Sequence, residues 1–180
     1  FRDRFLVADI PNYEKTKHLI DGEHHYQWRT GVKHDCSKIM ELEKVATGIF
    51  VNGFDEKIEL EESHIFPLLK GSDLANSKIP KKYMLVPQTQ IGQETKNLAK
   101  IAPKTWQYLL KHAAFLDKRA SSIYRGKPRF SIFGVGDYTF NDWKVAIPAL
   151  YKKLIFSVVG PYQGKPIVFD DTVNFIALGN

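Results

Sequence analysis

Short apolar or alternating runs, separated by turn residues, dominate the hydrophobic pattern of the first half of the chain. The run "RFLVADI" predicts an edge strand that stops at Pro11. Two dipeptides, Asp21-Gly22 and Asn52-Gly53, are typical of tight hairpin turns. Residues 45–51 and 56–60 flank the second dipeptide and predict its two strands, and "KYMLVP" predicts a further compact strand. The first half is therefore expected to be rich in β-structure.

The second half combines one helical segment with further strands. From about Pro103 to Ser121, apolar side chains recur at helical spacing, and Pro103 suits a first helical turn. Five short runs rich in β-branched and aromatic residues follow and predict a β-meander. Earlier in the chain, Pro67 and Gly71 prevent a long helix, so residues 70–73 are expected in a loop. The prediction is an α+β, sheet-rich fold with one long helix and a C-terminal β-meander.

Length and composition favour one folded domain, because 180 residues with 43% apolar content can form a hydrophobic core. No apolar run approaches the roughly 20 residues of a membrane-spanning helix, so no membrane partner is expected. The single cysteine, Cys36, and the absence of a signal pattern predict a cytoplasmic protein. The chain begins with Phe, which favours a fragment of a longer protein. Its net charge of +6 favours a polyanionic partner.

Several catalytic and metal sites are weakly indicated. Zinc-ligand types occur at His18, His24, His25, His34 and Cys36, but without paired spacing. Cys36 has no histidine placed as in a cysteine protease. Two acidic-x-Lys triplets, residues 55–57 and 142–144, resemble those of restriction nucleases and leave a nuclease fragment as an alternative. "FGVGDY" predicts a turn that allows close backbone approach at Gly134 and Gly136.

Three loops share a more consistent composition: "WRTGVKHDCSK", "FPLLKGSD" and "YRGKPRFSIFGVGDY". Each combines basic side chains with a hydroxyl or small residue and a neighbouring aromatic. Lysine and arginine neutralise phosphates, polar side chains contact base edges, and aromatics pack on sugars or bases. The three loops predict nucleic-acid binding, and a basic protein-interaction module is the remaining alternative.

The ordered series "IFPLLKGSDL", "KKYMLVPQ", "PKTWQYLLKHAAFLDKR" and the third loop with its following strands resembles the C-terminal specificity region of TaqI-type adenine-N6 DNA methyltransferases and fused restriction-modification enzymes. This resemblance implies that residues 26–180 form a target-recognition domain for double-stranded DNA. Residues 1–25 would continue from an upstream methyltransferase domain, with or without a nuclease domain.

The resemblance also implies that this fragment is not catalytic by itself. The family's Asn/Asp-Pro-Pro-Tyr/Phe motif and a cofactor-binding glycine loop are both absent from the sequence. S-adenosylmethionine is therefore expected in the parent's catalytic domain, where the target adenine would be flipped into a pocket. No cofactor, catalytic residue or metal ligand is expected in this fragment.

The residues expected to contact DNA are Trp28, Arg29, Thr30, Lys33, His34 and Lys38 in the first loop, Lys70, Ser72 and Asp73 in the second, and Arg125, Lys127, Arg129, Tyr138 and Lys144 in the third set. Lysines would position phosphates, whereas arginines would reach guanine edges. Structural roles are the alternative for each: Trp28 in the core, Asp73 as a helix cap, Lys144 as a strand-edge charge. His34-Asp35 stands where the family often has Thr-Gly.

Overall fold

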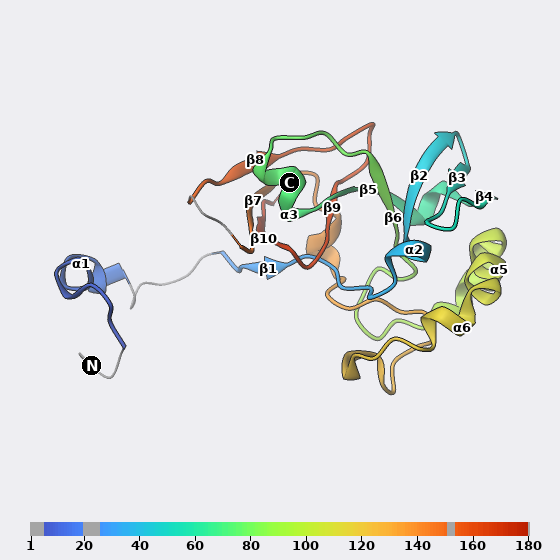
Figure 1. Cartoon of the computed structure of the whole chain (residues 1–180), viewed down its shortest axis with the longest axis horizontal. Coiled ribbons are helices and arrows are strands. Elements are labelled where there is room, and N and C mark those ends of the chain that lie inside the picture. Colours follow the sequence, from blue (N-terminus) through green and yellow to red (C-terminus); the bar gives the residue numbers. More distant parts are fainter. Residues whose placement is uncertain (1–5, 20–25, 151–153, 180) are drawn as a thin grey trace.

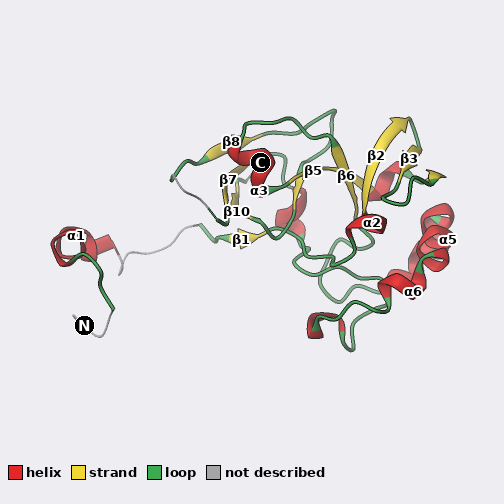
Figure 2. Ribbon diagram, viewed as in Figure 1, coloured by secondary structure: helices red, strands yellow, loops and turns green. Residues whose placement is uncertain are grey.

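The structure is a computed structural model that describes residues 6–19, 26–150 and 154–179 (Figure 1). In this part of the chain, strands form two sheets, and all the helices are short (Figure 2). The α+β, sheet-rich class predicted from the sequence is confirmed. No helix in the described segments is long and apolar enough to cross a membrane.

The larger sheet has six strands in the order β4-β3-β2-β6-β5-β9. Their bounds are β2 Glu41–Ala46, β3 Ile49–Val51, β4 Lys57–Glu59, β5 Ile65–Leu69, β6 Lys82–Leu85 and β9 Val168–Phe169. All neighbouring pairs are antiparallel except β5 and β9, which are parallel. Burial of Ile39, Leu42, Met84 and Leu85 places the main core against this sheet.

Helices α4 (Leu98–Ile101), α5 (Pro103–Lys111) and α6 (Ala113–Leu116) contribute Leu98, Leu109 and Leu116 to the same core. Pro103 begins α5 as predicted, but the single helix expected to reach Ser121 is wrong in length. The backbone leaves the helical conformation at His112 (φ −101°, ψ 13°). His112 is buried, stacks on Phe54 and lies 2.8 Å through Nε2 from Glu56 Oε2, so tertiary contacts override local helical periodicity there.

The smaller sheet has the order β1-β10-β7-β8. Its strands contribute to a second core cluster that includes Phe169, Val173 and Phe175. Its strands are β1 Arg29–Thr30, β7 Lys144–Pro148, β8 Ser157–Val159 and β10 Val173–Ala177. The predicted C-terminal β-meander is wrong in connectivity, because β9 leaves this sheet to pair with β5. β9 therefore connects the two sheets, and the chain turns at residues 170–172 to enter β10.

Turn chemistry explains where local predictions succeeded. β3 and β4 form the hairpin predicted at Asn52-Gly53, where the Asn52 side chain accepts hydrogen bonds from the backbone of Phe54 and Glu56. β6 confirms the strand predicted from "KYMLVP". The strand predicted over residues 45–51 is instead split by a turn at Gly48, whose φ of +70° favours glycine.

Three other local predictions concern the N-terminal residues, the hairpin at residues 21–22 and residues 70–73. The edge strand expected before Pro11 is wrong: Asp9 caps α1 (Ile10–Thr16) by accepting from the Asn12 backbone, and Pro11 suits that first turn. The hairpin at residues 21–22 lies outside the described residues. The loop expected at residues 70–73 is the start of α3 (Gly71–Ala75), and a further short helix is α2 (Ser37–Met40). Single-turn 3₁₀ helices cover Lys17–Leu19, Glu62–His64, Thr95–Asn97, Ser122–Tyr124 and Asp137–Phe140.

Candidate nucleic-acid interface

The first predicted loop runs along the junction between the two sheets. β1 pairs with β10, and the next two residues bond onward: Gly31 N donates to Val173 O (2.9 Å) and Val32 N to Phe169 O (2.8 Å). A Cβ atom at Gly31 would lie 2.2 Å from Asp170 O and 2.5 Å from Phe169 O. Only glycine allows this close approach, so residues 29–34 are fixed against the β9–β10 turn.

Within this segment, Arg29 meets the third predicted loop. Its guanidinium carbon lies 4.5 Å from the ring centroid of Tyr138, and the Tyr138 hydroxyl donates to Gly134 O (3.1 Å). On the neighbouring position, Thr30 Oγ1 donates to Asn174 Oδ1 (3.0 Å). Arg29 and Tyr138, which the sequence placed in separate loops, are therefore brought together. The stack orients the guanidinium without neutralising its charge.

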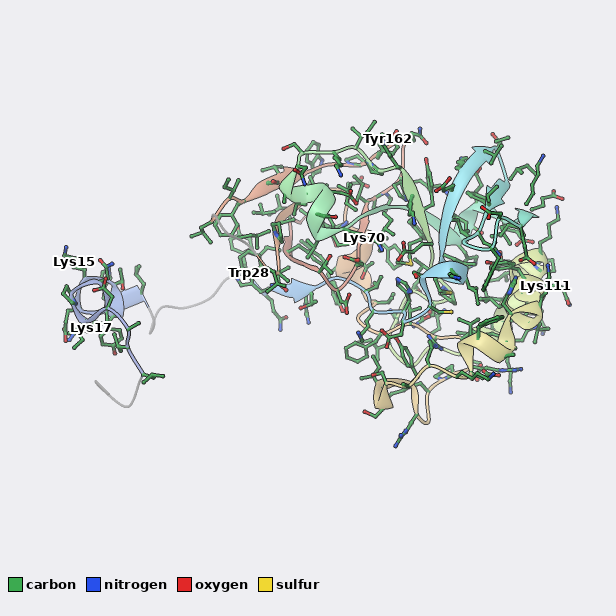
Figure 3. The ribbon with its side chains drawn as sticks, in the orientation of Figure 1. Lys15, Lys17, Trp28, Lys70, Lys111 and Tyr162 are labelled. Atoms are coloured by element: carbon green, nitrogen blue, oxygen red, sulfur yellow. The ribbon has the colours of Figure 1, made fainter. Side chains whose placement is uncertain are left out.

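Trp28 lies at the edge of this region, just before β1 (Figure 3). Its side chain is 48% exposed, and its ring centroid is 6.0 Å from that of Phe156. The alternative that placed Trp28 in the core is therefore wrong. An exposed aromatic beside a basic strand is available to pack on a sugar or a base.

Lys33 is held by two carboxylates. Its Nζ lies 2.9 Å from Asp35 Oδ1 and 3.0 Å from Asp171 Oδ2, and these hydrogen bonds raise the pKa of Lys33 above its usual range. Its backbone N and O both pair with Phe133, at 2.9 Å, in the third loop. Lys33 therefore links the first loop to the third loop and to Asp171, a residue that sequence reasoning missed.

His34 is buried, which contradicts its predicted role as a DNA contact. Its Nδ1 accepts a hydrogen bond from the Cys36 backbone N (3.1 Å), so the proton of the neutral ring belongs on Nε2. Nε2 lies 3.3 Å from Glu41 Oε1. The His34 side chain therefore packs inside the loop and is not part of its exposed surface.

Glu41, the first residue of β2, joins the first and second loops. Its buried carboxylate contacts His34, lies 2.6 Å through Oε1 from Lys70 Nζ, and lies 3.5 Å through Oε2 from Lys82 Nζ. Burial raises the pKa of this carboxyl, but the hydrogen bonds from His34 and Lys70 outweigh it and hold the pKa at about 2. Sequence reasoning missed both Glu41 and Lys82.

The β9–β10 turn also anchors the second loop. Thr172 Oγ1 accepts a hydrogen bond from the Gly71 backbone N (2.8 Å), and Asp170 Oδ2 lies 3.9 Å from Lys70 Nζ. Asp73 Oδ2 accepts from the Lys70 backbone N (3.3 Å), which supports the alternative of Asp73 as a helix cap for α3. Ser72 is exposed on the first turn of that helix. The turn thus holds the first two loops side by side.

The third loop and the segment before it contact the first loop through Tyr124 and Arg119, which were not predicted as DNA contacts. Tyr124 donates its hydroxyl to Lys33 O (3.2 Å), and Arg119 Nη1 donates to His34 O (3.2 Å) and Ser131 O (2.8 Å). Burial lowers the pKa of Arg119 from its usual value. Arg119, which was not predicted, is therefore a structural brace between the two loops.

The remaining basic candidates differ in whether their side chains have an ion-pair or aromatic partner. Arg125 and Lys127 are exposed. Arg129 is exposed but makes a bidentate pair with Asp117, with N–O distances of 3.2 and 2.6 Å. Lys38 is exposed, with its ammonium 5.2 Å from the Phe54 ring centroid. Lys38 lies against the β3–β4 hairpin, since Gly53 N donates to Lys38 O (2.8 Å), so it is not joined to the other loops by these contacts.

The structure contradicts the prediction that Lys144 is an exposed DNA contact. It is 1% exposed and donates from Nζ to Asn141 O (2.6 Å) and Ile167 O (2.9 Å). It lies on β7, between β10 and β8, so it is neither a strand-edge charge nor a DNA contact. Burial lowers its pKa to about 8, and Asp142 offsets this only in part.

Burial of Lys144 should make the free energy of unfolding depend on pH. Because the pKa is about 8 in the folded chain and 10.5 in the unfolded chain, the unfolded chain binds more protons between these values, and stability rises with pH there. Relative to Lys144→Met, the wild-type chain should gain about 2 kcal/mol of unfolding free energy between pH 7 and pH 9.5. Urea denaturation at both pH values measures this; a difference that does not change with pH contradicts it.

The second acidic-x-Lys triplet has its lysine in the core, because Lys144 is buried and donates to the backbone oxygens of Asn141 and Ile167. Across residues 6–19, 26–150 and 154–179, no group of three or more His, Cys, Asp or Glu side chains is placed to hold a metal ion.

Comparisons with known proteins found similarity in both sequence and structure. No protein-family model matches the chain. Over 179 residues it is 48% identical to Type II methyltransferase M.NspV of Nostoc sp. (strain ATCC 29411 / PCC 7524), covering 98% of this chain. The chain spans only 37% of that relative's length.

A solved structure with a similar fold is that of the type IIL restriction-modification enzyme MmeI in complex with DNA. The TM-score is 0.55 at 11% identity, over 88% of this chain and 20% of that chain. At this level of identity the likeness shows a shared fold.

Proposed function

We propose that this chain is the DNA target-recognition part of a type II restriction-modification methyltransferase and reads a short sequence in double-stranded DNA. The convergence of the three loops on residues 29–34 carries this proposal. Loops that are far apart in sequence present basic and aromatic side chains on one fixed framework, as direct readout of bases requires. The 48% identity to a type II methyltransferase supports it, as does the fold shared with an enzyme solved with DNA.

The side chains divide into two roles under this proposal. Arg29, preset by its stack on Tyr138, reads a base edge in the major groove, and Trp28 packs beside it. Lys127 and Lys38 neutralise phosphates, because they are exposed and flexible. Lys33 and Arg129 act with their carboxylate partners, which fix their directions and reduce their net charge.

Catalysis would belong to the remainder of the parent protein. The relative's chain is longer than the part matched here, which leaves room for a methyltransferase domain with bound S-adenosylmethionine. We propose that the parent methylates adenine at N6 after flipping it from the duplex, and that the described domain holds the DNA during this step. The alternative of a nuclease fragment has no metal-binding geometry among the described residues to support it.

Two substitutions separate base readout from phosphate binding. Arg29→Lys removes the planar guanidinium and its stack on Tyr138. It should weaken binding to the preferred sequence by about 1–3 kcal/mol and reduce the difference in affinity between that sequence and others. Lys127→Gln should weaken binding to all duplexes by a similar factor and reduce the salt dependence. Fluorescence anisotropy with the preferred and a scrambled duplex measures both. Equal effects of the two substitutions on sequence preference would contradict the division of roles.

The proposed activity is tested by expressing the full-length parent in a host without adenine methylation and mapping modified bases in host DNA. One short motif should carry N6-methyladenine. Arg29→Lys should reduce the extent of methylation at this motif or extend methylation to related sequences. Methylation of cytosine would overturn the adenine assignment but leave DNA recognition standing. Purified parent that binds no duplex with sequence preference would overturn the recognition role itself.

A further inference from the structure

We propose that Lys70, Lys81 and Lys82 form a pocket that binds one phosphate of the DNA backbone. This inference rests on the proposed function and adds a contact that the three-loop pattern did not contain, since Lys81 and Lys82 lie outside those loops. It assigns a specific role to a hollow on the surface next to the second loop.

The pocket is open and has a volume of about 280 Å³. It is lined by Leu68, Lys70, Ser72, Asp73, Lys81 and Lys82. β5 and β6 are neighbouring antiparallel strands in which Leu68 pairs with Lys82, so the strand register brings Lys70 and Lys82 to the same end of the sheet. Among these lining residues Leu68 alone is apolar, and the other five carry a charge or a hydroxyl group.

The charges around the pocket leave an excess of positive charge. Lys70 and Lys82 share the buried carboxylate of Glu41, at 2.6 and 3.5 Å, and Lys70 also lies 3.9 Å from Asp170. Asp73 is directed to Lys78, at 3.7 Å. Lys81 is exposed, and no carboxylate among the described residues lies within ion-pair distance of it. Two of the three lysines are therefore paired with the buried carboxylates of Glu41 and Asp170, and the charge of Lys81 is not offset by an ion pair.

This arrangement suits a phosphate. Two lysines that share a buried carboxylate are held close together despite their mutual repulsion, which lowers the entropy lost when an anion binds both. Lys82 keeps about half of its side chain exposed, so its ammonium remains available to solvent and ligand. Ammonium groups act as point charges for phosphate and carry no base preference.

The position of the pocket favours the DNA backbone over a free anion. Lys70 contacts Asp170, and the neighbouring Asp171 pairs with Lys33 of the first loop. Basic side chains therefore continue from Arg29 through Lys33 and Lys70 to Lys82, along the junction between the sheets. A duplex whose bases are read at Arg29 would place its backbone along this series.

The test uses the full chain, a duplex that carries its preferred sequence, and the double variant Lys81→Gln/Lys82→Gln. Losing one phosphate contact should reduce the slope of log K against log salt by about 0.9, and weaken binding at 0.1 M salt by about five- to tenfold. The loss should be the same for preferred and scrambled duplexes, because a phosphate contact reads no sequence. Lys57→Gln, an exposed lysine on β4 at the far edge of the larger sheet, is the matched control and should change neither quantity.

The outcomes separate this inference from the proposed function. If the wild-type chain binds its duplex but the double variant matches it in affinity and salt slope, the pocket assignment is wrong and the recognition role stands. If the wild-type chain binds no duplex, the proposed function fails first. Calorimetric titration with inorganic phosphate distinguishes the source: sub-millimolar binding that the double variant removes would assign the pocket to a free anion. Thermal unfolding of the double variant confirms that it is folded.

Discussion

Replacing Gly31 with alanine is expected to lower the free energy of unfolding by about 3 kcal/mol and to abolish binding to duplex DNA. The added Cβ would lie 2.2 Å from the backbone oxygen of Asp170, and neither backbone can move without breaking the β1–β10 pairing or the 2.8 Å bond from Val32 to Phe169. Urea denaturation and fluorescence anisotropy with a duplex measure the two effects.

Gly179→Ala is the matched control, because a Cβ at Gly179 meets no atom within 4 Å. This variant should unfold like the wild-type chain and bind DNA equally well. A Gly31→Ala chain with wild-type stability and affinity would show that residues 29–34 are not fixed against the β9–β10 turn.

Replacing Glu41 with glutamine should give the second large effect. The carboxylate holds His34, Lys70 and Lys82 from within the protein, and its removal leaves two lysines close together without the charge that stabilises them. The shift of its pKa from 4.5 to about 2 corresponds to about 3 kcal/mol of stability at neutral pH. DNA affinity should fall as well, because Lys70 loses its fixed direction.

The pH dependence identifies the carboxylate as the cause. A carboxyl whose pKa is lowered in the folded chain contributes its full stability above the unfolded value of 4.5, and loses it as pH falls toward 2. The stability gap between wild type and Glu41→Gln, measured by denaturation from pH 7 to pH 2.5, should therefore narrow below pH 4.5. Glu59→Gln, which removes an exposed carboxylate paired with Lys104, should change stability by less than about 1 kcal/mol. A gap that stays constant with pH would contradict the assignment.

Local features of the fold could be predicted from the sequence because neighbouring residues determine them. Pro103 at the start of α5 and the hairpin at Asn52-Gly53 depend on backbone preferences of a few residues. The extent of α5 did not follow, because a buried contact of His112 with Glu56 ends the helix. The departure of β9 from the C-terminal strands depends on pairing with β5, about 100 residues earlier in the chain.

The candidate site was predictable in its outline but not in its connections. Arg29, Lys33, Lys70 and Tyr138 could be chosen by composition, and contacts join them at one junction. Lys144 has the same composition signal, but its direction into the core depends on strand register and neighbours, which the run of residues does not reveal. Glu41, Asp171 and Lys82 were missed because the lysines and the carboxylates that they pair with lie from 29 to 138 residues apart in the chain.

The central claim is that the convergence of three loops on residues 29–34 reads a DNA sequence. Selection from a pool of random duplexes with the full chain, at fixed salt concentration near 0.1 M, tests it most directly. The account predicts enrichment of one short motif, with an affinity that falls as salt rises, and loss of that enrichment in Arg29→Lys but not in Lys57→Gln. Retention of duplexes without any shared motif, or no retention at all, would contradict it.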